Sequence, residues 1–276
     1  MTRKKPLVSV VMPAYNAEKF AVKSIQSVLN QTFKNFELII VDDASSDKTP
    51  QIIKEIQRID PRIRIITNKT NLLIAKSLNI GIKSARAKFI ARMDIDDIAH
   101  PDRLALQYEL LKKNPKIAIV GANMTIIDDK DNEITKREYP TSSKALKKLM
   151  FRYSPFGHPV IMIRKSIFNE FGGYKENIFP CEDIHLWFQI GSKYEFASIA
   201  KPLLKYRIKL ASSSHRNLKE LELLTLKIRL EAIRKYKYHF TFFDIFYNLS
   251  QFATIWILPS RIRIWLYNFL RSNKFI

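Results

Sequence analysis

Short apolar runs alternate with amphipathic segments through the first half of this 276-residue chain. This alternation is typical of parallel strands connected by helices, so it predicts an α/β fold. Ser46 or Asp47 is expected to cap the N-terminus of a helix at 49–59. Strands are predicted at 7–12, 36–41, 62–67, 88–93 and 117–120, and helices at 18–31, 49–59, 73–86 and 101–113.

The second half is less regular. His158–Arg164 is strand-like, the Gly172–Gly173 pair interrupts the pattern, and Glu182–Tyr194 has helical periodicity. Near Arg216 the pattern changes to long basic helices. We therefore divide the chain into a sheet-containing part, 1–215, and a basic amphipathic helical tail, 216–276.

Charge is distributed unevenly along the chain. Lys and Arg number 47 against 26 Asp and Glu, and from Lys201 onward 15 basic residues face 4 acidic ones. A uniformly basic surface for nucleic acid would not require this asymmetry. The single cysteine, Cys181, excludes an intramolecular disulfide and suits a reducing compartment. The basic start is followed by an apolar run that stops at Pro13, so no signal peptide is expected.

Acidic residues follow two of the predicted strands. Asp42 and Asp43 follow the second strand, and Asp94, Asp96 and Asp97 follow the fourth. Carboxyl ends of parallel strands share one edge of a sheet, where ligands bind. Solvated turn aspartates are the alternative. The D-x-D spacing of Asp94 and Asp96 suits Mg²⁺ or Mn²⁺, which would neutralise a diphosphate.

Three segments resemble family 2 glycosyltransferases, which have the GT-A fold. They read VSVVMPAYNAEKF, SIQSVLNQTFKNFELIIVDDASSDKT and NIGIKSARAKFIARMDIDDIAHPDRL. The resemblance implies a mostly parallel sheet flanked by helices, with a C-terminal helical extension here. It also implies metal-dependent transfer of a sugar from a nucleotide-sugar donor. Residues 1–100 would be the nucleotide-binding half of a catalytic domain, and 101–215 the acceptor-side half.

The resemblance assigns roles to individual residues at the strand ends. Pro13, Ala14 and Tyr15 would line the nucleotide base, which is expected to be uracil. Asp42 would bond the ring of the base, and Asp43 would lie near the ribose or the diphosphate.

The D-x-D segment receives its roles in the same way. Asp94 would contact the ribose or the metal, and Asp96 would bind the metal, Mn²⁺ or Mg²⁺. Asp97 would support the metal ligands or orient the donor sugar.

The sequence departs from the family pattern at several positions. Leu73 and Ala87 stand where Gly is frequent, and Leu78 stands where Arg is frequent. The missing Arg removes an expected diphosphate contact. Lys76 would either replace it or be solvated.

A downstream segment, GHPVIMIRKSIFNEFGGYKENIFPCEDIHLWFQI, resembles the acceptor side of the family. The resemblance makes Asp183 the general base that takes the proton of the acceptor hydroxyl. A helix N-terminus would keep this carboxylate ionised, although Glu182 and Asp183 as ordinary N-terminal helix acids remain the alternative. Two other positions, His158 and Gly173, would flank the donor sugar, and Glu182 would contact the donor or the acceptor.

The helix that follows this acidic pair carries three further positions of interest. His185 and Gln189 replace the Asp and Arg that are frequent in the family. His185 is expected on the helix surface, and Trp187 is expected in the core.

The tail combines positive charge with aromatic residues. Apolar residues at 218, 221, 224, 228 and 232 form one stripe of a helix. Residues 240–258 are apolar but contain Asp244, so we favour a helix in the membrane interface over a helical cap or a span. Arg261, Arg263, Trp265, Tyr267 and Arg271 would be interfacial anchors.

The sequence therefore predicts an inverting glycosyltransferase that acts on a saccharide or lipid-linked acceptor in surface polysaccharide or lipid-linked oligosaccharide synthesis. It would be cytoplasmic and peripheral at the inner face of an anionic membrane, with no nucleic-acid partner. One alternative is a nucleotidyltransferase, although PAYNAEKF lacks the Gly-rich loop of that class. The other is a non-enzymatic module that binds anionic membrane or nucleic acid.

Overall fold

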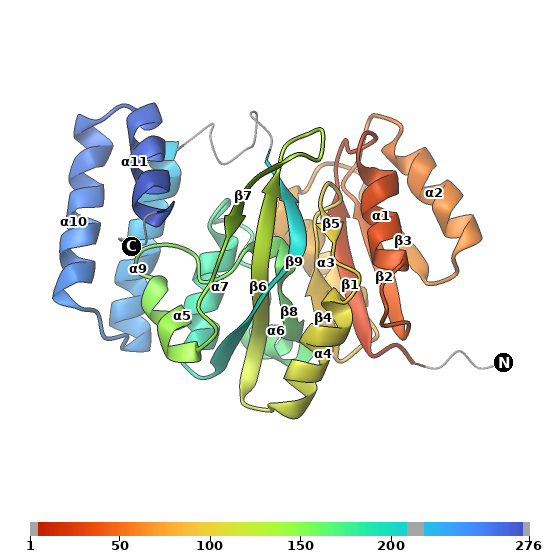
Figure 1. Cartoon of the computed structure of the whole chain (residues 1–276), viewed down its shortest axis with the longest axis horizontal. Coiled ribbons are helices and arrows are strands. Elements are labelled where there is room, and N and C mark those ends of the chain that lie inside the picture. Colours follow the sequence, from red (N-terminus) through yellow and green to blue (C-terminus); the bar gives the residue numbers. More distant parts are fainter. Residues whose placement is uncertain (1–4, 209–217, 273–276) are drawn as a thin grey trace.

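The computed structural model describes residues 5–208 and 218–272, so the predicted boundary between residues 215 and 216 lies outside the described residues. A nine-stranded mixed sheet forms the centre of the molecule (Figure 1). Its main path runs β3-β2-β1-β4-β8-β6-β9-β5, with β7 pairing to β6. The predicted α/β class is confirmed.

Four parallel strands form the N-terminal half of the sheet: β1 (Val8–Ala14), β2 (Phe36–Asp42), β3 (Ile63–Thr67) and β4 (Phe89–Arg92). All four were predicted to within two residues. Ala14 lies opposite Asp42, and Asp42 lies opposite Thr67. β1, β2 and β3 therefore end together, and β4 ends beside Val11 of β1, so the residues that follow the four strands lie at one edge.

The other strands extend the sheet on the far side of β4. They are β5 (Ile98–Ala99), β6 (Ile117–Ile127), β7 (Glu133–Arg137), β8 (Met162–Arg164) and β9 (Glu195–Arg207). β8 is antiparallel to both β4 and β6, whereas β9 runs parallel to β6. The sequence pattern did not predict β9, because Lys201 and Pro202 interrupt its apolar alternation. The segment expected as a strand from His158 begins as a short 3-10 helix, η1 (His158–Val160).

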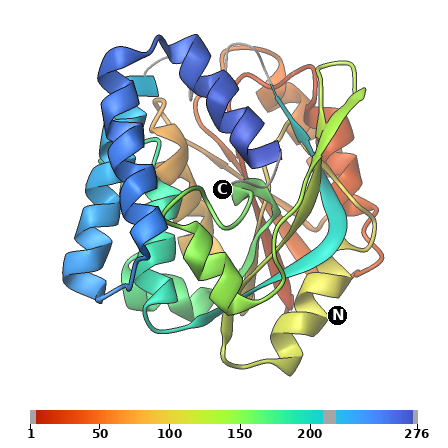
Figure 2. The ribbon, with the colours of Figure 1, turned by 60° about the vertical axis from the view of Figure 1, so that its left-hand side comes forward.

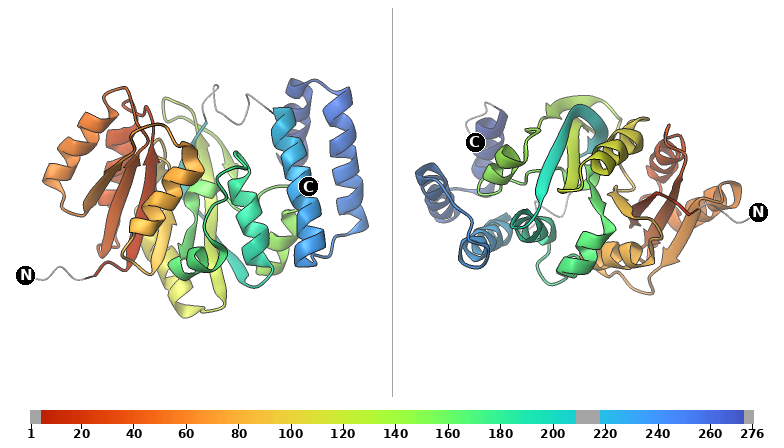
Figure 3. Two further views of the ribbon diagram at one scale, coloured as in Figure 1. Left: turned by 180° about the vertical axis from the view of Figure 1, so that it is seen from behind. Right: turned by 90° about the horizontal axis from the view of Figure 1, so that it is seen from below.

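Helices cover both faces of the sheet (Figures 1 and 3). α1 (Ala21–Leu29) and α4 (Arg103–Lys113) lie on one face; α3 (Leu73–Ser84), α6 (Lys165–Phe171) and α7 (Glu182–Gly191) lie on the other. α5 (Ser143–Leu149) packs against β9. The predicted cap of α2 (Thr49–Ile59) was wrong: Lys48 is its N-cap and makes no side-chain cap bond. Asp47 instead accepts a hydrogen bond from the Thr49 amide at 2.9 Å.

Three C-terminal helices stand at the end of the molecule away from α2: α9 (Leu218–Tyr236), α10 (Phe242–Ile257) and α11 (Ser260–Ser272) (Figures 1 and 2). The predicted apolar stripe of α9 faces inward, since Ile228 and Ala232 join the main core. α9 packs against α7, and α10 packs against α9. α9 thus has the contacts of a helical cap.

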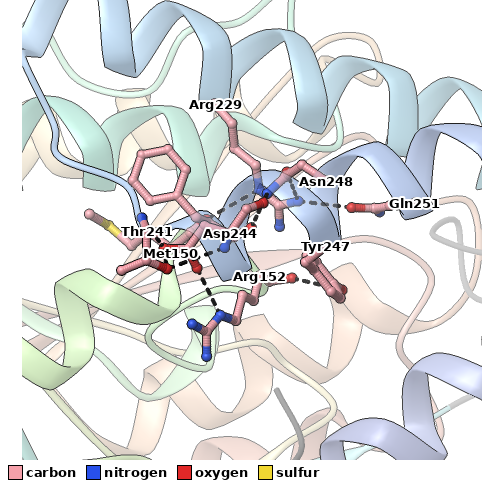
Figure 4. Close-up of polar contacts among 9 residues, drawn as sticks. Met150, Arg152, Arg229, Thr241, Asp244, Tyr247, Asn248 and Gln251 are labelled. Atoms are coloured by element: carbon pink, nitrogen blue, oxygen red, sulfur yellow. Dashed lines mark hydrogen bonds and ion pairs between the residues drawn. The ribbon is translucent and has the colours of Figure 1, made fainter.

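Polar side chains fix α10 to the rest of the chain (Figure 4). Asp244 is buried, forms an ion pair with Arg152 at 2.9 Å and completes a capping box with Thr241. Arg229 of α9 donates to the side-chain oxygens of Asn248 and Gln251, both at 2.9 Å. The polar residues that argued against a membrane span therefore point inward.

The outer face of α10 is apolar. Phe242, Phe246, Leu249 and Trp256 are each more than 60% exposed. Within 5–208 and 218–272, no helix is both long and apolar enough to cross a membrane.

Two of the five predicted interfacial anchors, Arg261 and Trp265, are exposed. The expectation was wrong for Arg263, whereas Arg271 and Tyr267 are partly buried. Arg263 is buried against Glu222, and Arg271 lies over the Tyr139 and Tyr153 rings.

Candidate active site

The ends of β1 and β2 form one side of the candidate site. Pro13 and Ala14 are buried at the end of β1, whereas Tyr15 is 51% exposed. Asp42 is buried, and its Oδ1 accepts from the Ser45 amide at 3.3 Å. The exposed Tyr15 ring beside a buried carboxylate offers a surface for a planar base.

Asp43 organises the loop that precedes α3. Its Oδ1 accepts hydrogen bonds from the Asn68 side chain at 2.8 Å and from the Leu72 amide at 2.9 Å. The same Asn68 amide group donates to the Ser77 hydroxyl. Asp43 therefore also has a structural function at the position where the sequence predicts a nucleotide contact.

Three carboxylates gather directly after β4. Asp94, Asp96 and Asp97 each place an oxygen within 4.8 Å of the others. Asp97 is fully buried, and its Oδ2 has no hydrogen-bond partner among the described residues. Burial, together with the charges of Asp94 and Asp96, raises the pKa of Asp97 well above its usual range. A cation at this position would satisfy the unpaired oxygen and reduce the repulsion.

Arg207 holds the acidic loop from the end of β9. Its amide donates to Asp97 Oδ1 at 2.9 Å, and its Nε donates to the Asp96 carbonyl at 2.9 Å. Its guanidinium also pairs with Asp131 in the β6–β7 turn. Because Arg207 is itself buried, these bonds fix the Asp97 carboxylate and the backbone of the acidic loop relative to the sheet.

The acidic pair of the second half begins α7, as predicted. Glu182 is buried, and its Oε2 has no hydrogen-bond partner among the described residues. Burial and the adjacent Asp183 carboxylate raise the pKa of Glu182 to about 7. Burial also raises the pKa of Asp183, against the opposing hydrogen bond from the Ile184 amide. The helix N-terminus was expected to favour the ionised form of Asp183, but desolvation outweighs this effect and raises the pKa of the carboxyl group.

Arg92 links the two acidic groups. Its Nη2 lies 2.7 Å from Asp94 Oδ1, and its positive charge partly opposes the rise that burial causes in the pKa values of Glu182 and Asp183. Arg92 is buried, and its Nε and Nη1 have no hydrogen-bond partners among the described residues. One guanidinium thus lies between the end of β4 and the start of α7.

His158 and the glycine turn lie beside this centre. His158 Nε2 is 2.9 Å from the Tyr174 hydroxyl, and burial lowers the pKa of His158 well below its usual range. A neutral imidazole is therefore expected here. Gly173 has φ +83°, and a Cβ there would lie 2.7 Å from Asn79 Oδ1. The close approach of Asn79 in α3 therefore explains why this position is a glycine.

The departures from the family pattern have structural consequences. Leu73 adopts a left-handed φ of 66°, a conformation that favours Gly. Leu78 is fully buried, whereas Lys76 is exposed. His185 was expected on the helix surface, but it is 8% exposed because α9 covers that side of α7. Trp187 lies in the core, as expected.

The sequence reasoning missed Arg92 and Arg207. A charged residue inside the apolar run FIARM was a signal for Arg92. Arg207 lies far from the acidic loop in sequence and at the end of a strand that was not predicted. The sequence offered no comparable signal for it.

The Glycosyl transferase family 2 sequence profile matches residues 9–172. An uncharacterised glycosyltransferase of Methanocaldococcus jannaschii is 36% identical over 94% of this chain and 91% of its own. Another, of Haemophilus influenzae, is 35% identical over 74% of this chain and 66% of its own. A UDP-Glc:α-D-GlcNAc-diphosphoundecaprenol β-1,3-glucosyltransferase of Escherichia coli is 33% identical over 78% of this chain and 83% of its own.

Solved structures share the fold at lower sequence identity. Staphylococcus aureus TarS in complex with UDP matches 81% of this chain and 65% of its own, with a TM-score of 0.65 and 20% identity. A Pyrobaculum calidifontis mannosyltransferase in complex with GDP-Man and Mn²⁺ matches 94% of this chain and 73% of its own, with a TM-score of 0.64 and 16% identity. The chain has the GT-A fold and belongs to glycosyltransferase family 2.

Proposed function

We propose that this protein is an inverting, metal-dependent glycosyltransferase that uses a nucleoside diphosphate sugar, UDP-linked, as donor. The observation that carries the proposal is the position of buried Arg92, which pairs with Asp94 and acts electrostatically on Asp183. The donor-side acids and the candidate base therefore belong to one site. The UDP-Glc donor in the name of the E. coli relative supports the choice of nucleotide.

The acidic loop suits a divalent cation, Mn²⁺ or Mg²⁺. Asp94 and Asp96 would hold it, with Asp97 behind them offering its unpaired Oδ2. When bound, the ion would neutralise the negative charge that develops on the departing diphosphate. The Mn²⁺ in the mannosyltransferase complex supports this assignment.

Asp183 takes the proton of the acceptor hydroxyl in this mechanism. The acceptor oxygen attacks the anomeric carbon from the face opposite the diphosphate, and the bond between that carbon and the phosphate oxygen breaks. The product has inverted configuration because a single displacement occurs. A raised pKa makes Asp183 a stronger base than an exposed aspartate. Pro13, Ala14, Tyr15, Asp42 and Asp43 would hold the nucleotide.

The acceptor is proposed to be a lipid-linked saccharide or surface polysaccharide, with the enzyme bound peripherally to an anionic membrane at its cytoplasmic face. The exposed apolar side chains of α10 and the basic residues of the tail support this location. Residues 1–215 would then be the catalytic domain, and 216–276 the membrane-facing tail.

A nucleotide-sugar screen tests the proposed function. Each nucleotide sugar is added with Mn²⁺, and both thermal stabilisation and transfer to water or acceptor are measured. We expect one UDP-sugar to raise Tm and to be turned over, with inversion at the anomeric carbon seen by NMR. A product of retained configuration would contradict the mechanism.

A further inference from the structure

A cavity of about 430 Å³ lies between the start of α7 and the three C-terminal helices, and Asp183 forms part of its wall. The helices α9, α10 and α11 contribute Leu221, Thr254 and Leu266, respectively. We propose that this cavity binds the acceptor, and that the acceptor is a sugar joined through a phosphate group to a long apolar chain. This inference rests on the proposed role of Asp183 as base.

The position of Asp183 locates the acceptor. A general base acts only on a hydroxyl within hydrogen-bond reach, so the acceptor must occupy space that Asp183 borders. The carboxylates that would bind the metal follow β4, and none of them lines the cavity. The cavity extends from Asp183 toward the tail instead, and its volume lies within the range of about 300–1,000 Å³ usual for ligand pockets.

The charge of the wall suits an anion. Four arginines line the cavity against two carboxylates, Asp183 and Glu222. The arginines are Arg137, Arg152, Arg229 and Arg263.

Three of these arginines are already engaged. Arg152 pairs with Asp244, Arg263 pairs with Glu222, and Arg229 donates to two amide oxygens. Arg137 lies over the Tyr206 ring and has no ion pair within the described part of the chain. Its guanidinium is therefore the donor group best placed to bind a phosphate of the acceptor.

The rest of the wall suits an apolar chain. Leu218, Leu221, Ile264 and Leu270 line the cavity. Two of these helices carry exposed aromatic side chains, Phe246 and Trp256 on α10 and Trp265 on α11. An amphiphile can thus place its sugar and phosphate inside while its lipid chain follows the apolar helices outward, which a soluble polysaccharide would not require.

Binding of farnesyl diphosphate, measured by calorimetry on the full-length protein, tests the cavity directly. Ser250→Trp fills the cavity from α10, whereas Ala253→Trp places the same ring on the exposed side of that helix. We expect wild type and Ala253→Trp to bind, and Ser250→Trp to lose binding. If Ser250→Trp unfolds, Thr254→Trp replaces it, because Thr254 lies one turn further along α10 and also lines the cavity.

Arg137→Gln tests the phosphate contact. It should weaken binding of farnesyl diphosphate about tenfold, the usual effect of one charge-assisted hydrogen bond, and leave binding of farnesol unchanged. Lys136→Gln, at the adjacent exposed position of β7, should leave both unchanged. No binding by wild type, or equal binding by the two Trp variants, would overturn the proposal.

Transfer assays separate this proposal from the proposed function. If wild type turns over no nucleotide sugar, the proposed function fails whatever the cavity binds. If wild type transfers sugar to a lipid-diphosphate acceptor and Ser250→Trp transfers equally well, only the cavity assignment is wrong. Donor hydrolysis by Ala253→Trp, whose new ring lies outside the cavity, should equal that of wild type.

Discussion

Arg92 Nη2 lies 2.7 Å from Asp94 Oδ1, at the point where a buried strand ends in the acidic loop. The pair is more than an ordinary salt bridge, because the charge of the same guanidinium opposes the rise that burial causes in the pKa values of both acids at the start of α7. Arg103 helps to hold Arg92 in place, because its Nη2 donates a hydrogen bond to the Arg92 carbonyl. The geometry of the donor side and the ionisation of the candidate base are therefore coupled through one side chain.

Replacing the candidate base should separate binding from chemistry. Asp183→Asn keeps the shape of the side chain but cannot accept the acceptor's proton, so transfer should fall about 100- to 10,000-fold. The Kd for the donor should change little. Glu195→Gln, an exposed acid just after α7, is the matched control. A loss below about tenfold would point to another residue as the base.

The metal requirement can be tested at Asp96. Asp96→Asn should fold with an unchanged Tm, since Asp96 is partly exposed, but should lose metal-dependent binding of the donor. Calorimetry with UDP-sugar in the presence and absence of Mn²⁺ measures this. Asp129→Asn, in the exposed β6–β7 turn, should behave like wild type. Full activity of wild type in excess chelator would remove the metal from the mechanism.

Glu182 should make stability depend on pH. Its pKa is raised to about 7 from an ordinary value of 4.5, so the folded state binds more protons than the unfolded state between these values. Stability should therefore fall as pH rises through this window, by at most about 3 kcal/mol. In Glu182→Gln this fall should be reduced, which urea unfolding at pH 5 and pH 8 can measure. Parallel pH profiles for both proteins would contradict the assignment.

Membrane association should depend on the apolar face of α10. Phe246→Ser combined with Trp256→Ser should reduce flotation with anionic liposomes, because burial of both rings in the interface is lost. Ile59→Ser removes an even more exposed apolar side chain from α2, at the opposite end of the molecule, and should have no effect. Added salt should weaken wild-type binding by screening the basic residues. Equal flotation with neutral and anionic vesicles would exclude the electrostatic contribution.

Leu73 offers a test of backbone strain. Its φ of 66° costs a non-glycine residue about 1–2 kcal/mol, and its side chain is 52% exposed, so little burial would be lost on replacement. Leu73→Gly should therefore raise the free energy of unfolding by about 1 kcal/mol. Leu73→Ala removes the same side chain but retains the strain, and should not stabilise the protein. Chemical denaturation of the three proteins distinguishes these outcomes.

Local patterns were sufficient for the N-terminal half of the sheet. β1, β2 and β4 are buried along their whole length and β3 is partly buried, and amphipathic helices alternate with these strands, so the periodicity of the residues predicted the elements. Because the carboxyl ends of parallel strands share one edge of a sheet, the pattern also predicted that Asp42 and Asp94 would lie at the same edge. The acidic residues and their resemblance to a family were also sufficient to predict the class of enzyme.

Only the tertiary structure decided how the second half surrounds that edge. β9 brings Arg207 to Asp97 across 110 residues of sequence, and α9 buries His185. The spacing of apolar residues along the chain does not predict either contact. The tail also required the fold: its sequence placed Asp244 and Arg263 beside apolar residues, but packing directs both inward and leaves Phe246 and Trp256 outside. The physical reason is that burial and ion pairing depend on neighbours distant in sequence, whereas strand and helix periods depend on neighbours along the chain.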